Sequence, residues 1–245
     1  MTISLTVLGS STPYPRPDNP CSGYLVAHGE TTIWLDAGPG TLAALQQYTA
    51  IDELDAIWIS HMHADHSADL LVALYALLFA DLEPPGPIPL YGPPGIAARL
   101  ADFLTNTQRA PVEEAFEVHE LHDGHQACIG RLQLTSHAVA HGFPAFGLRV
   151  FDGTKVLAYS GDTGPCQGLA KIADGADLFL CEADSAEQSP VHLTPLDAGR
   201  AAAGTGRLVL THVGPSLTPL EAEAQASTVY TGPIAYAAPG SVFTL

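Results

Sequence analysis

Lysine and arginine are scarce in this chain of 245 residues, and their scarcity narrows the range of partners. Nine of them stand against 26 aspartates and glutamates, which gives a formal net charge of −17. No basic residue occurs from Pro17 to Ala98. Proteins that bind nucleic acid draw most of their affinity from lysine and arginine side chains that neutralise phosphates. The composition therefore disfavours large nucleic acids as partners and favours small substrates.

Long apolar runs are missing as well. Residues 70–80 (LLVALYALLFA) lie between Asp69 and Asp81 and fall short of the ~20 residues that a membrane-spanning helix needs. The first residues, MTISLTVLGSS, lack the basic start and apolar centre of a secretion signal and read as a strand. We therefore expect a cytoplasmic protein that makes no use of the membrane.

Closely spaced cysteine pairs are also absent. Cys21, Cys128, Cys166 and Cys181 lie far apart and form no CxxC motif. This spacing fits neither a zinc ribbon nor a dense disulfide framework. We expect four buried free thiols.

Strands and helices alternate along the chain, without an internal repeat or a low-complexity linker. Alternation of period and turn residues predicts strands over 3–9, 22–29, 31–38, 55–60 and 87–93, and helices over 41–50, 67–83 and 95–107. Further strands are expected within 115–141 and over 144–152, 155–162, 176–184 and 207–213, with a helix over 194–205. Such a mixture indicates an α/β layered fold, which we expect to form one domain over residues 1–245.

The predicted helix over 67–83, with Ser67 as its N-cap, is apolar on nearly every side. A helix of this kind is buried either in the body of its own subunit or in an interface. Because it carries more apolar surface than one sheet can cover, we expect a homodimer.

The segment SHMHADH, residues 60–66, gathers three histidines and an aspartate directly after an apolar strand. His61 and His63 are two positions apart, and Asp65 and His66 lead into the next helix. Imidazole nitrogen and carboxylate oxygen suit zinc, and a catalytic zinc site keeps one coordination position open. The segment predicts a metal site, which leaves open both a hydrolase and a metal-binding module without catalytic activity.

One short segment cannot complete two coordination shells, so further ligands are needed downstream. His141, Asp162 and His212 stand at the ends of predicted strands, where a site along one edge of a sheet draws its residues. His192 lies just before a predicted helix. The other histidines are expected to be surface or hydrogen-bonded residues: His28, His119, His122, His125 and His137.

Several motifs together resemble the metallo-β-lactamase fold, and within it the ribonuclease Z-like branch. They are HMHADH, then HGFPAFGLRV, SGDTGP and LTHVG, in this order along the chain. Two further segments, CEAD at 181–184 and HLTPLDAG at 192–199, resemble that branch specifically. The resemblance extends over nearly the whole chain and is more specific for fold and metal than for substrate.

The resemblance implies an αββα four-layer sandwich with two zinc ions, for which manganese or iron are alternatives. It assigns His61, His63 and His141 to the first ion, Asp65, His66 and His212 to the second, and Asp162 to a bridge between them. A metal-held hydroxide would be the nucleophile, because metal binding lowers the pKa of water to about 7. Asp65 would orient the water, and His192 paired with Glu182 would protonate the leaving group. Relatives in this branch are often dimers, in line with the expected homodimer.

One departure from ribonuclease Z is informative. In that enzyme a basic, glycine-rich arm that reaches the tRNA body is inserted between the motifs that correspond to His141 and Asp162. Here only residues 142–161 separate the two, enough for two strands and a turn. We predict a zinc-dependent phosphodiesterase of small substrates, with cyclic nucleotides as the first class to test. A tRNA 3′-processing endonuclease and a lactonase or carboxylic-ester hydrolase remain alternatives. Residues 17–23 and 160–164 are candidate phosphate cradles because small residues let backbone N–H groups approach a ligand.

Overall fold

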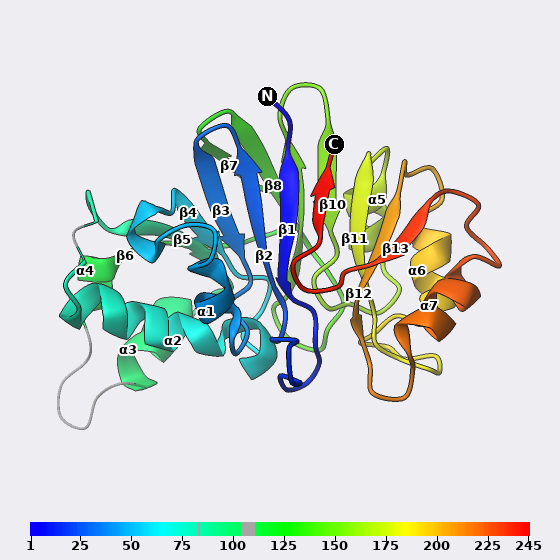
Figure 1. The fold of residues 1–245 in the computed structure, drawn as a ribbon, viewed down its shortest axis with the longest axis horizontal. Coiled ribbons are helices and arrows are strands. Elements are labelled where there is room, and N and C mark those ends of the chain that lie inside the picture. The colour runs from blue at the N-terminus through cyan, green and yellow to red at the C-terminus, as the bar shows by residue number, and fades with distance from the viewer. Residues whose placement is uncertain (83, 104–110) are drawn as a thin grey trace.

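A computed structural model describes residues 1–82, 84–103 and 111–245. The last residue of the predicted helix over 67–83 and the last four of the predicted helix over 95–107 lie outside these ranges. Among the described residues, the chain forms two β-sheets that face each other, with helices on both outer sides (Figure 1).

The strands of the first sheet come mainly from the N-terminal half of the chain. In sheet order they are β14 (Val242–Thr244), β1 (Ser4–Gly9), β2 (Gly23–His28), β3 (Thr31–Leu35), β4 (Ala56–Trp58), β5 (Ile88–Gly92) and β6 (Phe116–Glu120). From β3 to β6 neighbouring strands are parallel, so their carboxyl ends lie along the same edge.

The second sheet is built from the rest of the chain. In sheet order it contains β13 (Ile234–Tyr236), β12 (Leu208–Val213), β11 (Leu178–Ala183), β10 (Val156–Tyr159), β9 (Phe146–Phe151), β8 (Leu132–Ala138) and β7 (His125–Ile129). The strands from β10 to β13 are parallel, and those from β7 to β10 are antiparallel.

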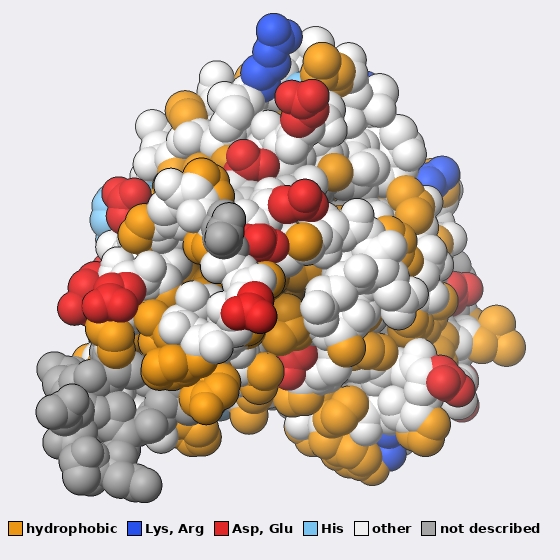
Figure 2. Space-filling view, turned by 60° about the vertical axis from the view of Figure 1, so that its left-hand side comes forward, with side chains coloured by type: hydrophobic (Ala, Val, Ile, Leu, Met, Phe, Trp, Pro, Cys, Tyr) orange, Lys and Arg blue, Asp and Glu red, His pale blue; other side chains and the backbone are white. Residues whose placement is uncertain are grey.

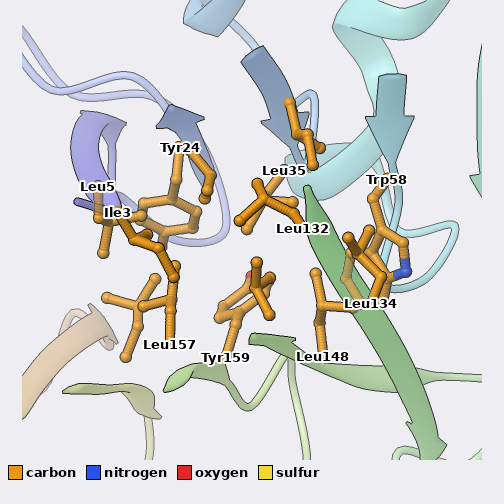
Figure 3. Packing of buried hydrophobic residues seen from close by; sticks show 14 of the residues in the cluster. Ile3, Leu5, Tyr24, Leu35, Trp58, Leu132, Leu134, Leu148, Leu157 and Tyr159 are labelled. Carbon is orange, nitrogen blue, oxygen red and sulfur yellow. The ribbon is translucent and has the colours of Figure 1, made fainter. Parts of the chain in front are cut away.

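The space between the sheets is filled by apolar side chains from both of them (Figure 3). Leu5, Tyr24 and Trp58 of the first sheet pack with Leu148 and Tyr159 of the second. Side chains alternate between the two faces of a strand, so every second residue enters this core and the others meet the helices.

Helices cover the outer face of each sheet. Over the first sheet lie α1 (Thr41–Leu45), α2 (Ala64–Phe79), α3 (Ile96–Phe103) and α4 (Val112–Ala115). Over the second lie α5 (Gln167–Ala173), α6 (Pro195–Ala201) and α7 (Pro219–Ala226). The expected αββα sandwich is therefore confirmed. The sequence analysis predicted none of α4, α5, α7, β13 and β14.

The start of α2 differs from its prediction. The helix begins at Ala64, three residues earlier than expected, and its N-cap is His63 with an extended backbone. Ser67 is therefore inside the helix, where its hydroxyl donates a hydrogen bond to the His63 carbonyl at 2.8 Å. As a result Asp65 and His66 belong to the first helical turn and not to a connecting loop.

The side of α2 that faces away from the sheet is exposed. Leu70 and Leu74 are fully buried, whereas Val72, Tyr75 and Phe79 are 56%, 57% and 66% exposed. Figure 2, which brings this side of the molecule forward, shows apolar side chains gathered near its lower edge. The subunit alone thus does not bury the whole helix, contrary to one of the two expected arrangements.

Two further expectations concern thiols and the membrane. All four cysteines are free, but only Cys21 and Cys181 are buried; Cys128 is exposed and Cys166 half-buried, so the expectation of four buried thiols is wrong. Cys128 lies on β7, at the edge of the second sheet, and Cys166 is the N-cap residue of α5. No helix in the described ranges is long and apolar enough to cross a bilayer.

Candidate metal centre

The structure brings the seven predicted ligands together in two adjoining groups. Within each group the candidate ligand atoms all lie within 4.8 Å of one another. All of the seven except His63 are buried. The groups are His61, His63, His141 and Asp162, and Asp65, His66 and His212.

Five of the seven candidate ligands lie at or just after the carboxyl end of a strand, and Asp65 and His66 lie in the first turn of α2. His61 and His63 follow β4, and α2 begins directly after them. His141 follows β8 and Asp162 follows β10. His212 lies near the end of β12, with a positive φ of 48°. Because these strand ends meet at one edge of the sandwich, residues up to 151 positions apart share one site.

The rings of four histidines are oriented by hydrogen bonds at Nδ1. The partners are Ser60 Oγ at 2.9 Å for His61, Asp36 Oδ2 at 2.7 Å for His66, the Val191 carbonyl at 2.8 Å for His141 and Ser22 Oγ at 3.0 Å for His212. With Nδ1 engaged, the Nε2 atom is the one available to a cation.

Three ring nitrogens converge in the first group. His63 Nδ1 lies 3.2 Å from His61 Nε2 and 3.1 Å from His141 Nε2. Burial lowers the pKa of all three histidines below its ordinary value. Neutral imidazoles that present their lone pairs to one point form the nitrogen ligand set that zinc prefers.

Asp162 lies between the two groups. Its Oδ1 is 3.3 Å from His66 Nε2, and its Oδ2 is 3.4 Å from His212 Nε2 and 3.7 Å from His61 Nε2. Burial favours the neutral carboxyl, but His212, His66 and His61 outweigh it and hold the pKa of Asp162 well below its usual range. Oδ1 is buried without a hydrogen-bond partner. A buried carboxylate oxygen in this state fits a cation, since an unpaired buried charge is otherwise costly.

Asp36 supports the site and was not identified from the sequence. It is fully buried and accepts hydrogen bonds from Ser60 N at 2.7 Å, Ser60 Oγ at 2.8 Å, Tyr159 OH at 2.6 Å and His66 Nδ1 at 2.7 Å. Since the Ser60 hydroxyl donates to Asp36, it accepts from His61 Nδ1 and leaves His61 Nε2 free. Asp36 thus fixes two of the candidate ligands.

Protons and a cation would compete for His66. Burial disfavours its protonation, but Asp162 and Asp36 outweigh burial and raise the pKa of His66 well above its ordinary value. The negative charge of the two carboxylates therefore favours a proton on His66. The same charge favours a divalent cation in place of that proton.

Glu182 and His192 form the predicted pair beside the two groups. His192 Nδ1 lies 3.0 Å from Glu182 Oε1. The His192 ring stands 4.9 Å from the His141 ring and 6.0 Å from the His212 ring, between centroids. His192 is therefore next to both groups without belonging to either of them.

The Glu182 carboxylate is surrounded by donors. It is fully buried and accepts from the backbone N–H groups of Thr163 at 2.8 Å, Asp184 at 3.0 Å and Leu193 at 3.2 Å. Burial raises the pKa of Glu182 to about 7, although the hydrogen bond from His192 opposes this. Burial would lower the pKa of His192, but Glu182 raises it to about 9. The backbone N–H groups around Glu182 all donate to it, which favours an ionised carboxylate beside a protonated imidazole.

An open cleft of about 560 Å³ exposes both groups to ligands. His63, Asp65, Asp162, His192 and His212 line it, together with Thr12, Pro13, Ala64, Asp184 and Pro215. Asp184 was also missed: its Oδ1 lies 3.9 Å from His212 Nε2 and accepts from the Thr12 hydroxyl at 3.4 Å. It stands at the end of an apolar strand, the signal that identified Asp162.

The remaining predictions on this region have mixed outcomes. None of the five other histidines joins either group in the described residues. His28 is buried beside Asp152, with 3.8 Å between His28 Nε2 and Asp152 Oδ2. In the two predicted phosphate cradles, several backbone N–H groups already donate hydrogen bonds within the protein. Their N–H groups at Cys21, Ser22, Thr163 and Gly164 donate to Pro39, Asp65, Glu182 and Ala140.

The chain is similar to known proteins in both sequence and fold. Residues 31–213 match the Beta-lactamase superfamily domain. An uncharacterized protein of Mycobacterium leprae is 35% identical over 255 aligned positions, which cover 100% of this chain and 89% of that protein. A ribonuclease Z of Mycobacterium bovis is 30% identical over 275 positions, covering 95% and 94%. The crystal structure of the metallo-beta-lactamase fold protein YhfI from Bacillus subtilis superimposes with a TM-score of 0.87 at 25% identity, and each chain is covered completely.

Asp36→Asn tests the support of the cluster. The substitution keeps a residue that tolerates the positive φ of 54° but removes the charge that holds His66 Nδ1. We expect the affinity for a divalent cation, measured by competition with a chromophoric chelator, to fall roughly 10- to 100-fold. Asp18→Asn is the matched control, since Asp18 also has a positive φ, of 61°, but is exposed. Unchanged affinity in Asp36→Asn, or an equal loss in the control, would contradict this role.

Proposed function

We propose that this chain, which belongs to the beta-lactamase superfamily, is a binuclear metal-dependent hydrolase of small phosphodiesters, with cyclic nucleotides as its first candidate class. The observation that carries the proposal is that two ligand groups meet at Asp162, with His192, hydrogen-bonded to Glu182, beside them in one cleft. Hydrolysis of a phosphodiester with an alkoxide leaving group can use all three features, whereas a module that only stores metal needs no proton donor.

The proposed ligand sets follow the two groups. His61, His63 and His141 would hold one ion, Asp65, His66 and His212 the other, and Asp162 both. Zinc suits this nitrogen and oxygen donor set, with manganese and iron as alternatives. When bound, two such ions lower the pKa of a water molecule and neutralise charge on the phosphoryl group.

The side chains around the cleft divide the proton transfers between them. Asp65 lines the cleft and can accept a hydrogen bond from the attacking water, which orients it toward phosphorus. Glu182 holds Nδ1–H of His192, so that Nε2–H is the proton available to the leaving oxygen. The carboxylate also stabilises the imidazolium before transfer.

Size selection follows from charge and from the short connection after His141. The described residues between His141 and Asp162 form the β9–β10 hairpin and carry no arm. The alignment with the Mycobacterium bovis ribonuclease Z runs over 275 positions, more than the 245 residues of this chain, so it contains gaps in this chain. We therefore propose that the substrate is a small diester and not pre-tRNA, even though the Mycobacterium bovis relative is named ribonuclease Z.

A hydrolysis screen of the zinc-loaded protein tests this choice. We expect higher kcat/KM on bis-p-nitrophenyl phosphate and cyclic nucleotides than on pre-tRNA or a lactone, because nine lysines and arginines in a chain of net charge −17 are too few to hold a long polyanion. Cleavage of pre-tRNA at its 3′ end with the highest kcat/KM would favour the endonuclease. Preference for the lactone would favour the carboxylic-ester hydrolase.

Replacement of His192 tests its proposed role as proton donor. His192→Ala should lower kcat roughly 10²- to 10⁴-fold on a diester with an alkoxide leaving group. The loss should be much smaller with p-nitrophenolate, which leaves without protonation. Metal content should not change, because His192 lies outside both ligand groups.

His137→Ala is the matched control for His192→Ala. His137 also faces a carboxylate, with 3.4 Å between its Nδ1 and Asp123 Oδ1, but it lies outside the cleft. It should leave both rates unchanged. Equal losses on the two leaving groups, or loss of metal from His192→Ala, would make His192 a structural residue or a ligand.

We also propose that the exposed face of α2 is covered in a homodimer. Val72, Tyr75 and Phe79 are large apolar side chains on one helix, and more than half of each is exposed. Light scattering at micromolar concentration should give twice the chain mass of 25.6 kDa, and Tyr75→Glu should halve it. Leu220→Glu, at an exposed position on α7, is the control. A wild-type mass of 25.6 kDa would contradict the dimer.

A further inference from the structure

A second pocket, of about 310 Å³, adjoins the candidate metal centre and has no part in the proposed chemistry. It shares His63 with the catalytic cleft. The rest of its lining is apolar except for one cation: Met62, Pro93, Pro94, Arg99, Phe143 and Pro144.

The connections that carry the candidate ligands also form this pocket. Met62 lies between His61 and His63, and Phe143 follows His141 by two residues. Gly142 between them has a φ of +83°, a conformation that glycine adopts without strain. The opposite wall comes from the connection between β5 and α3 and from α3 itself. A ligand in this pocket would therefore touch the centre at His63.

The Phe143 ring forms an apolar wall directly against the centre. Its centroid lies 4.4 Å from that of His63, 5.2 Å from His141 and 5.7 Å from His61. The side chain is nevertheless 38% exposed. One part of the ring thus packs on the histidines, while another remains available to a ligand.

Arg99 supplies the positive charge of the pocket. It is the first basic residue after Arg16, in a chain with a net charge of −17. Its side chain is exposed on α3, and within the described ranges its guanidinium has no hydrogen bond and no ion pair. An unpaired guanidinium beside apolar walls suits a ligand that is planar and carries hydrogen-bond acceptors.

We propose that this pocket binds the nucleobase of a substrate whose phosphodiester lies at the metal centre. A base stacks on an aromatic ring and on flat proline faces, and its ring nitrogens and carbonyl oxygens accept hydrogen bonds from arginine. The inference rests on the proposed function, and it narrows the substrate class from small phosphodiesters to those that carry a nucleoside.

An alkyl chain is the competing occupant. A larger groove of about 580 Å³ between α2 and α3 shares Met62 and Arg99 with the pocket and is lined by Leu71, Leu100 and Phe103. An alkyl chain that ran from the centre into this groove would pass the Arg99 guanidinium and offer it no acceptor. The geometry therefore favours a base in the pocket over a chain in the groove.

The contribution of the base can be isolated by titration calorimetry on the zinc-loaded protein. A nucleoside 5′-monophosphate and ribose 5-phosphate carry the same phosphate and sugar and differ only in the base. We expect the nucleotide to bind roughly 5- to 150-fold more tightly, the range that stacking of one base gives. Phe143→Ala should remove most of this ratio, and Arg99→Gln should reduce it about tenfold or abolish it.

Two controls match these variants. Arg131→Gln removes the same charge from an exposed arginine outside the pocket and should leave the ratio unchanged. Phe103→Ala removes a ring from the neighbouring groove and should also leave it unchanged.

Equal affinities of the wild type for the two ligands would overturn the base site. So would an unchanged ratio in both Phe143→Ala and Arg99→Gln. Loss of the ratio in Phe103→Ala alone would place the ligand in the groove instead. Hydrolysis of bis-p-nitrophenyl phosphate, measured on the same protein, distinguishes failure of the base pocket from failure of the proposed function. If the protein hydrolyses this diester but binds the two ligands equally, only the base pocket is wrong.

Discussion

The buried carboxylate of Asp36 is the contact on which the candidate centre depends. It follows β3 of the first sheet and accepts a hydrogen bond from Tyr159 of β10 in the second sheet. The same carboxylate takes hydrogen bonds from Ser60 before the cluster and from His66 inside α2. A buried carboxylate without such donors would be strongly destabilising. These four donors therefore stabilise it only when both sheets and α2 are in place, and in that arrangement the ligand rings face one another.

Close backbone packing holds the same region together. Ala37 N donates to the His66 carbonyl at 2.7 Å, and Ser22 N donates to the Asp65 carbonyl at 3.2 Å. A Cβ on Gly38 would lie 2.1 Å from that Asp65 oxygen, so only glycine allows α2 to approach this closely. The first turn of α2 is thus anchored at the strand ends, and Asp65 and His66 are positioned by the backbone as well as by their side chains.

The sequence indicated most of the candidate ligands because their signals are local. HMHADH places four candidate ligands within six residues. Asp162 and His212 are ionisable residues at the ends of apolar strands, a position that points to a site and not to the hydrophobic core. Asp36 ends an apolar strand in the same way, but its role concerns Nδ1 of His66 and becomes visible only once α2 packs on the loop after β3. The pocket lined by Arg99 and Phe143 combines three segments that are far apart in the sequence, so no local sequence pattern predicts it. The outer face of α2 is exposed in the single chain, so its burial depends on contacts that one sequence does not specify.

The central claim is that two cations bind each chain and share Asp162. Metal analysis of protein purified without chelator and then saturated with zinc tests it most directly. The account predicts two ions per chain in the wild type and clear loss from both groups in Asp162→Asn, because one carboxylate serves both. A content near one ion per chain that does not rise when zinc is added would contradict it.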